Sequence, residues 1–233
     1  MERLSEAWDR EADAWVAWAR RAGHDSYWRF HREAFLGLLP APGRIALDLG
    51  CGEGRVARDM AGLGHRVLAV DRSPTMVRHA AAAGGPALVL QADAVALPLA
   101  TASVDLVVAF MSLQDMDDMA GAVREAGRVL APGGRLCLAV VHPLNAIGHF
   151  TAREMDAPFV VEGDYFQRRR FVDVVERDGL RMAFNQGHWP LQDYFGALEA
   201  AGLLTEAVRE PRPGGESRWN RVPLFLHVRA SKP

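Results

Sequence analysis

The feature that most constrains this chain is the stretch from Ile45 to Arg55, in which an apolar segment breaks into alternating glycines at Gly50, Gly52 and Gly54. This pattern predicts a buried strand, a sharp turn and the start of a helix. Glycine at such positions lets the chain turn tightly and lets a ligand approach the backbone. Because the N-terminus of the next helix favours an anionic group, the stretch is typical of nucleotide-binding proteins.

Two acids and the glycine spacing narrow the ligand class, since binders of NAD, FAD, nucleotides and S-adenosylmethionine (SAM) all use a glycine-rich turn. Asp48 stands two residues before the first glycine. Asp71 ends the next apolar run about 20 residues later, where a ribose-binding carboxylate is expected. The spacing is Gly-x-Gly-x-Gly, and Arg55 occupies the place of the last glycine in the dinucleotide pattern. The spacing therefore counts against an NAD-dependent oxidoreductase.

Short apolar runs alternate with helical patterns from residue 44 onward, which indicates a parallel sheet covered on both faces. The predicted strands lie at 44–49, 65–70, 87–91, 104–111, 135–141, 159–161, 171–176, 180–184, 204–209 and 222–229. The predicted helices lie at 2–22, 26–38, 54–63, 74–84, 117–130 and 191–201. We expect residues 130–134 to end a helix and turn into a strand.

Four segments, residues 48–54, Asp71, residues 91–93 and residues 130–134, together resemble the class I SAM-dependent methyltransferases. The likeness is closest to the small-molecule branch related to the ubiquinone and menaquinone biosynthesis enzymes. It implies an α/β, Rossmann-like, doubly wound, seven-stranded and mostly parallel sheet with an antiparallel last strand. The domains that it implies are an N-terminal helical cap over 1–43, a SAM-binding core over 44–142, a substrate-covering insertion over 143–188, and a final helix with edge strands over 189–233.

The resemblance also implies roles for side chains at the carboxyl ends of the strands, where ligands of such sheets bind. Asp71 has acceptor-only oxygens for both ribose hydroxyls, although helix capping is an alternative role. Asp93 is expected to bind the adenine amine unless it is a plain loop residue, and Met76 to lie on the adenine face. The full set of expected cofactor contacts is Asp48, Gly50, Cys51, Gly52, Asp71, Arg72, Met76, Asp93, Ala94, Phe110 and Met111.

Methyl transfer depends mainly on orienting the nucleophile, so a base is needed only if the acceptor must lose a proton. His142, after the fifth predicted strand, is the first candidate for this base because imidazole titrates near neutrality. His188 is the second, and His149, Gln114 and Asp115 follow. A structural role is the alternative for each histidine.

Aromatic residues in the N-terminal segment and the insertion predict an apolar or aromatic small-molecule acceptor. The expected substrate contacts are Tyr27, Trp28, His31, Gln114, Asn145 and Trp189, and Phe150, Phe159, Tyr165 and Phe166 are expected to add aromatic surface. We interpret the stripe of Trp8, Trp15 and Trp18 as packing against the main domain, with a roof over the substrate pocket as the alternative.

The charge, the cysteine count and the lengths of the apolar runs limit the partners and the location that we expect for the protein. The alternative function is methylation of RNA or protein. A net charge of −2 over 233 residues counts against RNA, because it provides no positive field that would attract nucleic acid. Two cysteines provide neither a disulfide framework nor a metal site. The sequence has no apolar run of signal or membrane-spanning length. We therefore expect a cytoplasmic monomer or homodimer that releases S-adenosylhomocysteine (SAH).

Overall fold

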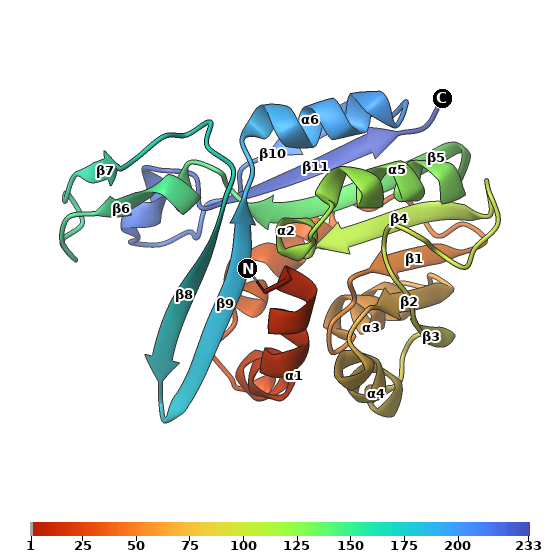
Figure 1. The fold of residues 1–233 in the computed structure, drawn as a ribbon, viewed down its shortest axis with the longest axis horizontal. Coiled ribbons are helices and arrows are strands. Elements are labelled where there is room, and N and C mark those ends of the chain that lie inside the picture. Colours follow the sequence, from red (N-terminus) through yellow and green to blue (C-terminus); the bar gives the residue numbers. More distant parts are fainter. Residues whose placement is uncertain (1) are drawn as a thin grey trace.

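The computed structural model describes residues 2–233, and its central element is a seven-stranded sheet of order β10-β11-β5-β4-β1-β2-β3 (Figure 1). The strands β1 to β5 run parallel to one another, whereas β11 pairs antiparallel with both β5 and β10. This arrangement confirms the predicted fold class. The strands are β1 Ala46–Leu49, β2 Val67–Asp71, β3 Leu88–Gln91, β4 Val104–Phe110, β5 Leu130–Val141, β10 Leu204–Arg209 and β11 Phe225–Ser231.

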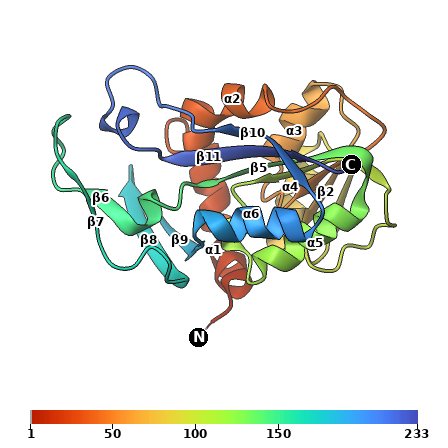
Figure 2. The ribbon, with the colours of Figure 1, turned by 90° about the horizontal axis from the view of Figure 1, so that it is seen from above.

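Helices cover both faces of the sheet, which is why β1 is buried along its whole length. Figure 2 shows α2 and α3 on one side and α5 and α6 on the other. Leu47 and Leu49 belong to the core on the α5 side, and Ala46 belongs to the core on the α3 side, as strand alternation requires. The helices of the core are α3 Arg55–Gly62, α4 Pro74–Ala83, α5 Met119–Val129 and α6 Leu191–Ala200.

Two helical segments precede the sheet, close to the predicted ranges. The first is α1 (Leu4–Arg20), and the second begins with a π-helical turn (η1, Tyr27–His31) and continues as α2 (Arg32–Leu36). The first helix lies against the N-terminal part of α4, where Ala12 and Val16 pack on Met76. The N-terminal segment thus lies at the same edge of the sheet as the glycine-rich turn.

The segment between β5 and α6 forms two hairpins, β6 (Gly148–Phe150) with β7 (Phe159–Val161), and β8 (Arg169–Arg177) with β9 (Leu180–His188). The β8–β9 hairpin lies beside α1, as Figure 1 shows. Strand β7 has its predicted bounds, whereas β6 was not predicted. Short 3-10 turns complete the chain: η2 Leu113–Asp115, η3 Asn145–Ile147 and η4 Arg218–Asn220.

Several predicted boundaries shift by a few residues, and the largest change in an element's type concerns the start of β5. Residues 130–134, expected to be the turn between a helix and a strand, already belong to β5. Leu130 pairs with Val104, and Gly133 adopts a φ of 78° that bends the strand there. Within residues 2–233, none of the helices has the length and apolar character needed to cross a bilayer.

Candidate functional site

A cavity of about 540 Å³ lies at the carboxyl ends of β1, β2 and β4. The strand order reverses between β1 and β4, and ligands of doubly wound sheets bind at such a switch point. The volume of the cavity is within the range of sites that bind small molecules. The sheet provides one wall, and α1 with the β8–β9 hairpin provides the other.

All the residues expected to contact the cofactor line this cavity, from Asp48 in β1 to Met111 after β4. They come from the ends of β1, β2 and β4 with the turns that follow them, from the loop after β3 and, for Met76, from the first turn of α4. Residues far apart in the chain therefore meet at one edge of the sheet, as the parallel topology requires.

The glycine-rich turn is tightly fitted to its neighbours. The amides of Gly50 and Cys51 donate to the Val70 carbonyl at 2.8 and 3.0 Å. Gly50 has a φ of 72°, and a Cβ on it would lie 2.6 Å from the Cβ of Ser112. A side chain at position 50 would thus be strained and would displace the loop after β4.

Asp71 links the turn after β1 to the helix after β2. Its Oδ2 accepts from the Gly52 amide at 2.8 Å and its Oδ1 from the Ser73 amide at 2.9 Å. The bond from the Ser73 amide is the contact expected if Asp71 caps the helix after β2. Asp71 also lines the cavity, as expected for a residue that binds the cofactor. Because each carboxylate oxygen has two lone pairs, each can still accept one hydroxyl proton.

Asp48 is the most deeply buried acid of the cavity, with only 1% of its surface exposed. Among residues 2–233, its Oδ2 has no hydrogen-bond partner. Burial and the nearby Asp71 carboxylate raise the pKa of Asp48 to about 7. Asp48 therefore changes charge near neutral pH and is a natural partner for a cationic group.

The far end of the cavity is more open. Arg72 and Asp93 form an ion pair there at 3.5 Å, and each side chain is nearly half exposed. The Asp93 Oδ1 also accepts from the Val95 amide at 3.2 Å. Met76 packs beneath α1 and still lines the cavity.

An aromatic cluster forms the opposite wall. The rings of Trp8 and Trp15 are 5.9 Å apart, and Phe184 of β9 lies 6.0 Å from Trp15 and 5.9 Å from Trp18, all edge to face. All four rings line the cavity. Because Trp8 and Trp15 also pack against the cluster that contains Met76 of α4, the stripe matches both interpretations, packing against the main domain and a wall of the pocket. Their spacing on one helix face was the signal in the sequence.

Arg55, the residue after the glycines, lines the cavity and forms a buried ion pair with Asp25. Its guanidinium lies 4.9 Å from the Trp15 ring centroid and 5.1 Å from that of Tyr27. Sequence reasoning missed this pair, because Asp25 has no local pattern that marks it as the partner of Arg55. The pair joins the N-terminal segment to the first turn of α3.

The loop after β4 crosses the cavity next to the glycine turn. Met111 has a φ of 52°, a strained value for a side chain of this size. Ser112 then donates its hydroxyl to the Leu49 carbonyl at 2.7 Å. This turn directs Gln114 and Asp115 to the cavity lining.

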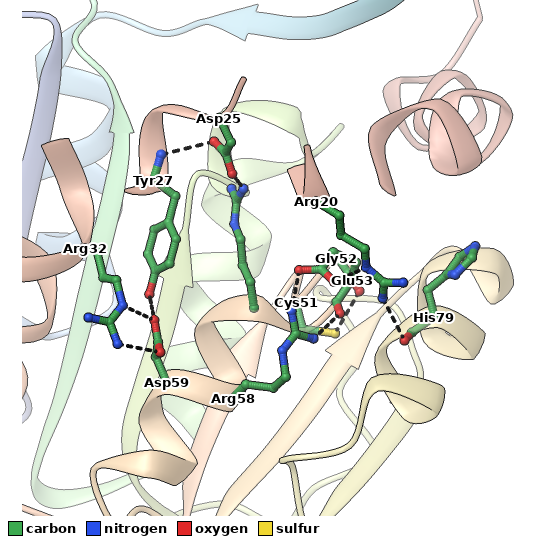
Figure 3. A network of polar contacts seen from close by, with 11 residues as sticks. Arg20, Asp25, Tyr27, Arg32, Cys51, Gly52, Glu53, Arg58, Asp59 and His79 are labelled. Carbon is green, nitrogen blue, oxygen red and sulfur yellow. Dashed lines mark hydrogen bonds and ion pairs between the residues drawn. The ribbon is translucent and has the colours of Figure 1, made fainter. Parts of the chain in front are cut away.

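The three predicted substrate contacts in the N-terminal segment, Tyr27, Trp28 and His31, are not in the cavity lining. Tyr27 donates its hydroxyl to Asp59 at 2.5 Å, and Asp59 also binds Arg32, as Figure 3 shows. Trp28 is 53% exposed on the outer surface. His31 lies under the sheet, with its Nδ1 2.9 Å from the Nε2 of His227. The helical turn thus directs Tyr27 toward α3 and His31 toward the sheet, and it leaves Trp28 at the surface.

Both candidate base histidines also lie outside the cavity lining. The Nε2 of His142 is 3.2 Å from Glu210, and burial lowers the pKa of His142. The Nε2 of His188 is 2.7 Å from the Tyr165 carbonyl. The structure thus gives these two histidines structural contacts.

The remaining predicted contacts outside the N-terminal segment, apart from Gln114, are also absent from the cavity lining. Asn145 begins a 3-10 turn, and Trp189 packs on the core beside α6. Phe150 and Phe159 form their own cluster with Trp219, at 4.9 and 6.2 Å from its ring. Tyr165 accepts from the Leu191 amide and Phe166 is exposed. Of the six predicted substrate contacts, Gln114 lines the cavity.

Ion pairs hold the N-terminal segment to the glycine turn. The buried Glu53 accepts from Arg20 of α1 at 2.9 Å and from Arg58 of α3 at 2.7 Å, as Figure 3 shows. His79 and Asp13 form a second link, between α4 and α1, at 2.9 Å. The first helix is thus fixed over the cavity by charged contacts along its length.

Comparison with known proteins links this geometry to a family. Residues 47–138 match the family model described as "Methyltransferase domain". A Mycobacterium tuberculosis protein named "Probable S-adenosylmethionine-dependent methyltransferase" is 35% identical over 142 residues, which cover 57% of this chain and 52% of that protein. A ubiquinone biosynthesis O-methyltransferase of a Methylobacterium species is 34% identical over 122 residues, covering 51% of this chain and 49% of that protein. The chain thus spans about half the length of these curated relatives.

Solved structures extend the likeness to most of the chain. A SAM-dependent methyltransferase from Mesorhizobium loti superposes with a TM-score of 0.70 at 25% identity, covering 86% of this chain and 96% of that one. The 1,6-didemethyltoxoflavin-N1-methyltransferase of Burkholderia thailandensis, solved with SAH, has a TM-score of 0.61 at 18% identity, covering 98% and 87% of the two chains. The second likeness concerns the fold alone.

Proposed function

We propose that the chain is a SAM-dependent methyltransferase that acts on a small apolar or aromatic molecule. The match of residues 47–138 to the methyltransferase domain and the likeness to named SAM-dependent methyltransferases support this proposal. The observation that carries the proposal is one cavity with two unlike walls. The sheet side offers glycines and carboxylates, and the α1 and β9 side offers Trp8, Trp15, Trp18 and Phe184. The first wall suits a polar cofactor, and the second suits an apolar acceptor.

The cofactor side fits SAM group by group. Asp71 would hold the ribose hydroxyls, and Asp93 the adenine amine. The turn at Gly50 and Gly52 would lie along the methionine part, with the Asp48 carboxylate available to a positive charge. When bound, SAM supplies a methyl group that its sulfonium already activates. The tasks of the protein are therefore to orient the acceptor and to exclude water from the cavity.

Labelled methyl transfer tests the acceptor class. The purified chain is incubated with methyl-labelled SAM and a cell extract divided into dialysable metabolites, RNA and protein. We expect label in the dialysable fraction, and we expect Asp71→Ala, which removes the ribose acceptor, to lower it strongly when SAM is below saturation. Label that enters RNA or protein instead would contradict the small-molecule proposal.

A further inference from the structure

The acceptor end of the cavity contains buried oxygens that need a hydrogen-bond donor. Within the described part of the chain, residues 2–233, the Oε1 of Gln114 and the Oδ1 of Asp115 have no hydrogen-bond partner. Both residues line the cavity, and Gln114 is only 3% exposed. Buried polar atoms are normally satisfied, so each of these atoms points to a ligand.

The contacts of Gln114 leave its side-chain oxygen as an acceptor, and the Asp115 carboxyl is an acceptor in its ionised form. The Nε2 of Gln114 donates to the Met111 carbonyl at 2.9 Å, which fixes the amide orientation and leaves Oε1 as the acceptor. Asp115 is acceptor-only when ionised. Burial raises the pKa of its carboxyl well above the usual range, and the Trp8 indole beside it lowers the pKa in part.

Of the four arginines that line the cavity, Arg3 is exposed and the other three are already engaged, with Arg72 paired to Asp93. Arg55 pairs with Asp25, and the Nη1 of Arg177 donates to the Gly23 carbonyl at 2.9 Å. Arg170 pairs with Asp117 at 2.8 Å. The acceptor end therefore favours a ligand that brings its own donors and disfavours an anionic one.

We propose that the acceptor is an amine on an aromatic body, with its nitrogen between the Gln114 Oε1 and the Asp115 carboxylate and its ring against Trp8 and Phe184. This inference rests on the proposed function. A primary amine fits better than a hydroxyl, because two oxygens require two donors and only the amine carries two protons on the reacting atom. Burial raises the pKa of Asp115 and so favours its neutral form, whereas the hydrogen bonds donated by the amine favour its ionised form, and this carboxylate acts as the base. As the new C–N bond forms and the C–S bond of the cofactor breaks with its electron pair going to sulfur, the nitrogen loses one proton to the Asp115 carboxylate.

Binding to the SAH-saturated protein tests the inference without turnover. The probes are 2-phenylethylamine, 2-phenylethanol and phenylacetate, which share a ring and differ in the polar group, and the method is calorimetry. We expect the amine to bind about tenfold or more tightly than the alcohol, and phenylacetate to bind more weakly than both. Asp115→Asn and Gln114→Leu should each lower the amine affinity by about tenfold and change the alcohol affinity much less.

The control is Asp173→Asn on the exposed strand β8, which changes the net charge as Asp115→Asn does but lies outside the cavity lining. It should leave all three affinities unchanged. Equal binding of amine and alcohol, no binding of any probe, or an unchanged amine affinity in both cavity variants would overturn the inference. Retained SAH binding in these variants would leave the proposed function intact, whereas a wild-type protein that binds no SAH would remove both.

Discussion

Single residues set the charge of the cavity. Asp48, Asp71 and Asp115 are carboxylates that the fold removes from water, and burial raises the pKa of each. Such shifts are common at functional sites, since a buried acid is costly unless a ligand or a proton neutralises it. The cavity floor thus suits a cation, which the sulfonium and ammonium groups of SAM provide.

The raised pKa of Asp48 predicts pH-dependent cofactor binding. Its pKa is about 7, so the carboxyl is increasingly protonated below that pH and loses its attraction for a cation. We expect the SAM affinity to rise between pH 6 and pH 8, with a limit of about tenfold per pH unit below the pKa. Calorimetry across this range tests the prediction. Asp48→Asn should show a flat profile, and a flat profile in the wild-type protein would contradict it.

Tyr27 shows how a residue-scale prediction from sequence failed. It was expected to contact the substrate, but its hydroxyl binds Asp59 in α3 and its ring is fully buried. We expect Tyr27→Phe to lower the free energy of unfolding by about 2 kcal/mol, because a hydrogen bond to a charged group is lost. Urea unfolding measures this change. Unchanged stability together with weaker ligand binding would restore the substrate role.

At the scale of elements, the N-terminal helices are the parts whose positions decide the site. The first helix closes the cavity through Trp8, Trp15 and Trp18, and Glu53 ties it to the glycine turn. The segment η1–α2 instead covers the sheet, where His31 meets His227 of β11. The two helical segments therefore have different tasks, one at the ligand and one in the core.

The His31–His227 pair predicts acid sensitivity of this covering segment. Burial lowers the pKa of His31 to about 2 and that of His227 to about 4, from 6.5 when unfolded. Below pH 6.5 the unfolded chain binds protons that the folded chain excludes, so stability falls as the pH drops toward 4. At pH 5.5 the loss from the pair is about 3 kcal/mol relative to neutral pH.

The double variant His31→Phe with His227→Leu removes both titrating groups from a pocket lined by Phe35, Phe110 and Phe225. Urea unfolding at pH 5.5 and 7.5 should show a smaller acid loss for the variant than for the wild-type protein. Equal losses in the two proteins would mean that the pair does not cause the acid sensitivity.

The elements of the core were predictable because their signals are local. Periodicity and a flanking glycine predict β10 with its observed bounds, and the acid that ends the second apolar run is Asp71, the last residue of β2. The direction of a side chain depends on what packs against its element, which one sequence does not reveal. Tyr27 was therefore expected at the substrate but is buried in the core, whereas the tryptophans of α1, interpreted mainly as packing, also line the cavity. The Asp25–Arg55 pair was missed for the same reason.

At the scale of the whole molecule, the parallel sheet and its covers form one binding site from distant parts of the chain. The strand ends supply the cofactor-side residues, the loop after β4 supplies Gln114 and Asp115, and the β8–β9 hairpin completes the aromatic wall. Since α1 and β9 close over the sheet edge, we infer that ligand binding stabilises the whole chain. By mass action, a ligand at about 100 times its Kd adds about 2.7 kcal/mol.

The most direct test of the account is calorimetric titration of the wild-type protein and the Asp71→Ala variant with SAH and with NADH. We predict that SAH binds the wild-type protein at one site and NADH does not. Loss of the ribose contact should weaken SAH binding to Asp71→Ala by about 2 kcal/mol or more. Binding of NADH without SAH, or an SAH affinity that Asp71→Ala leaves unchanged, would contradict the central claim.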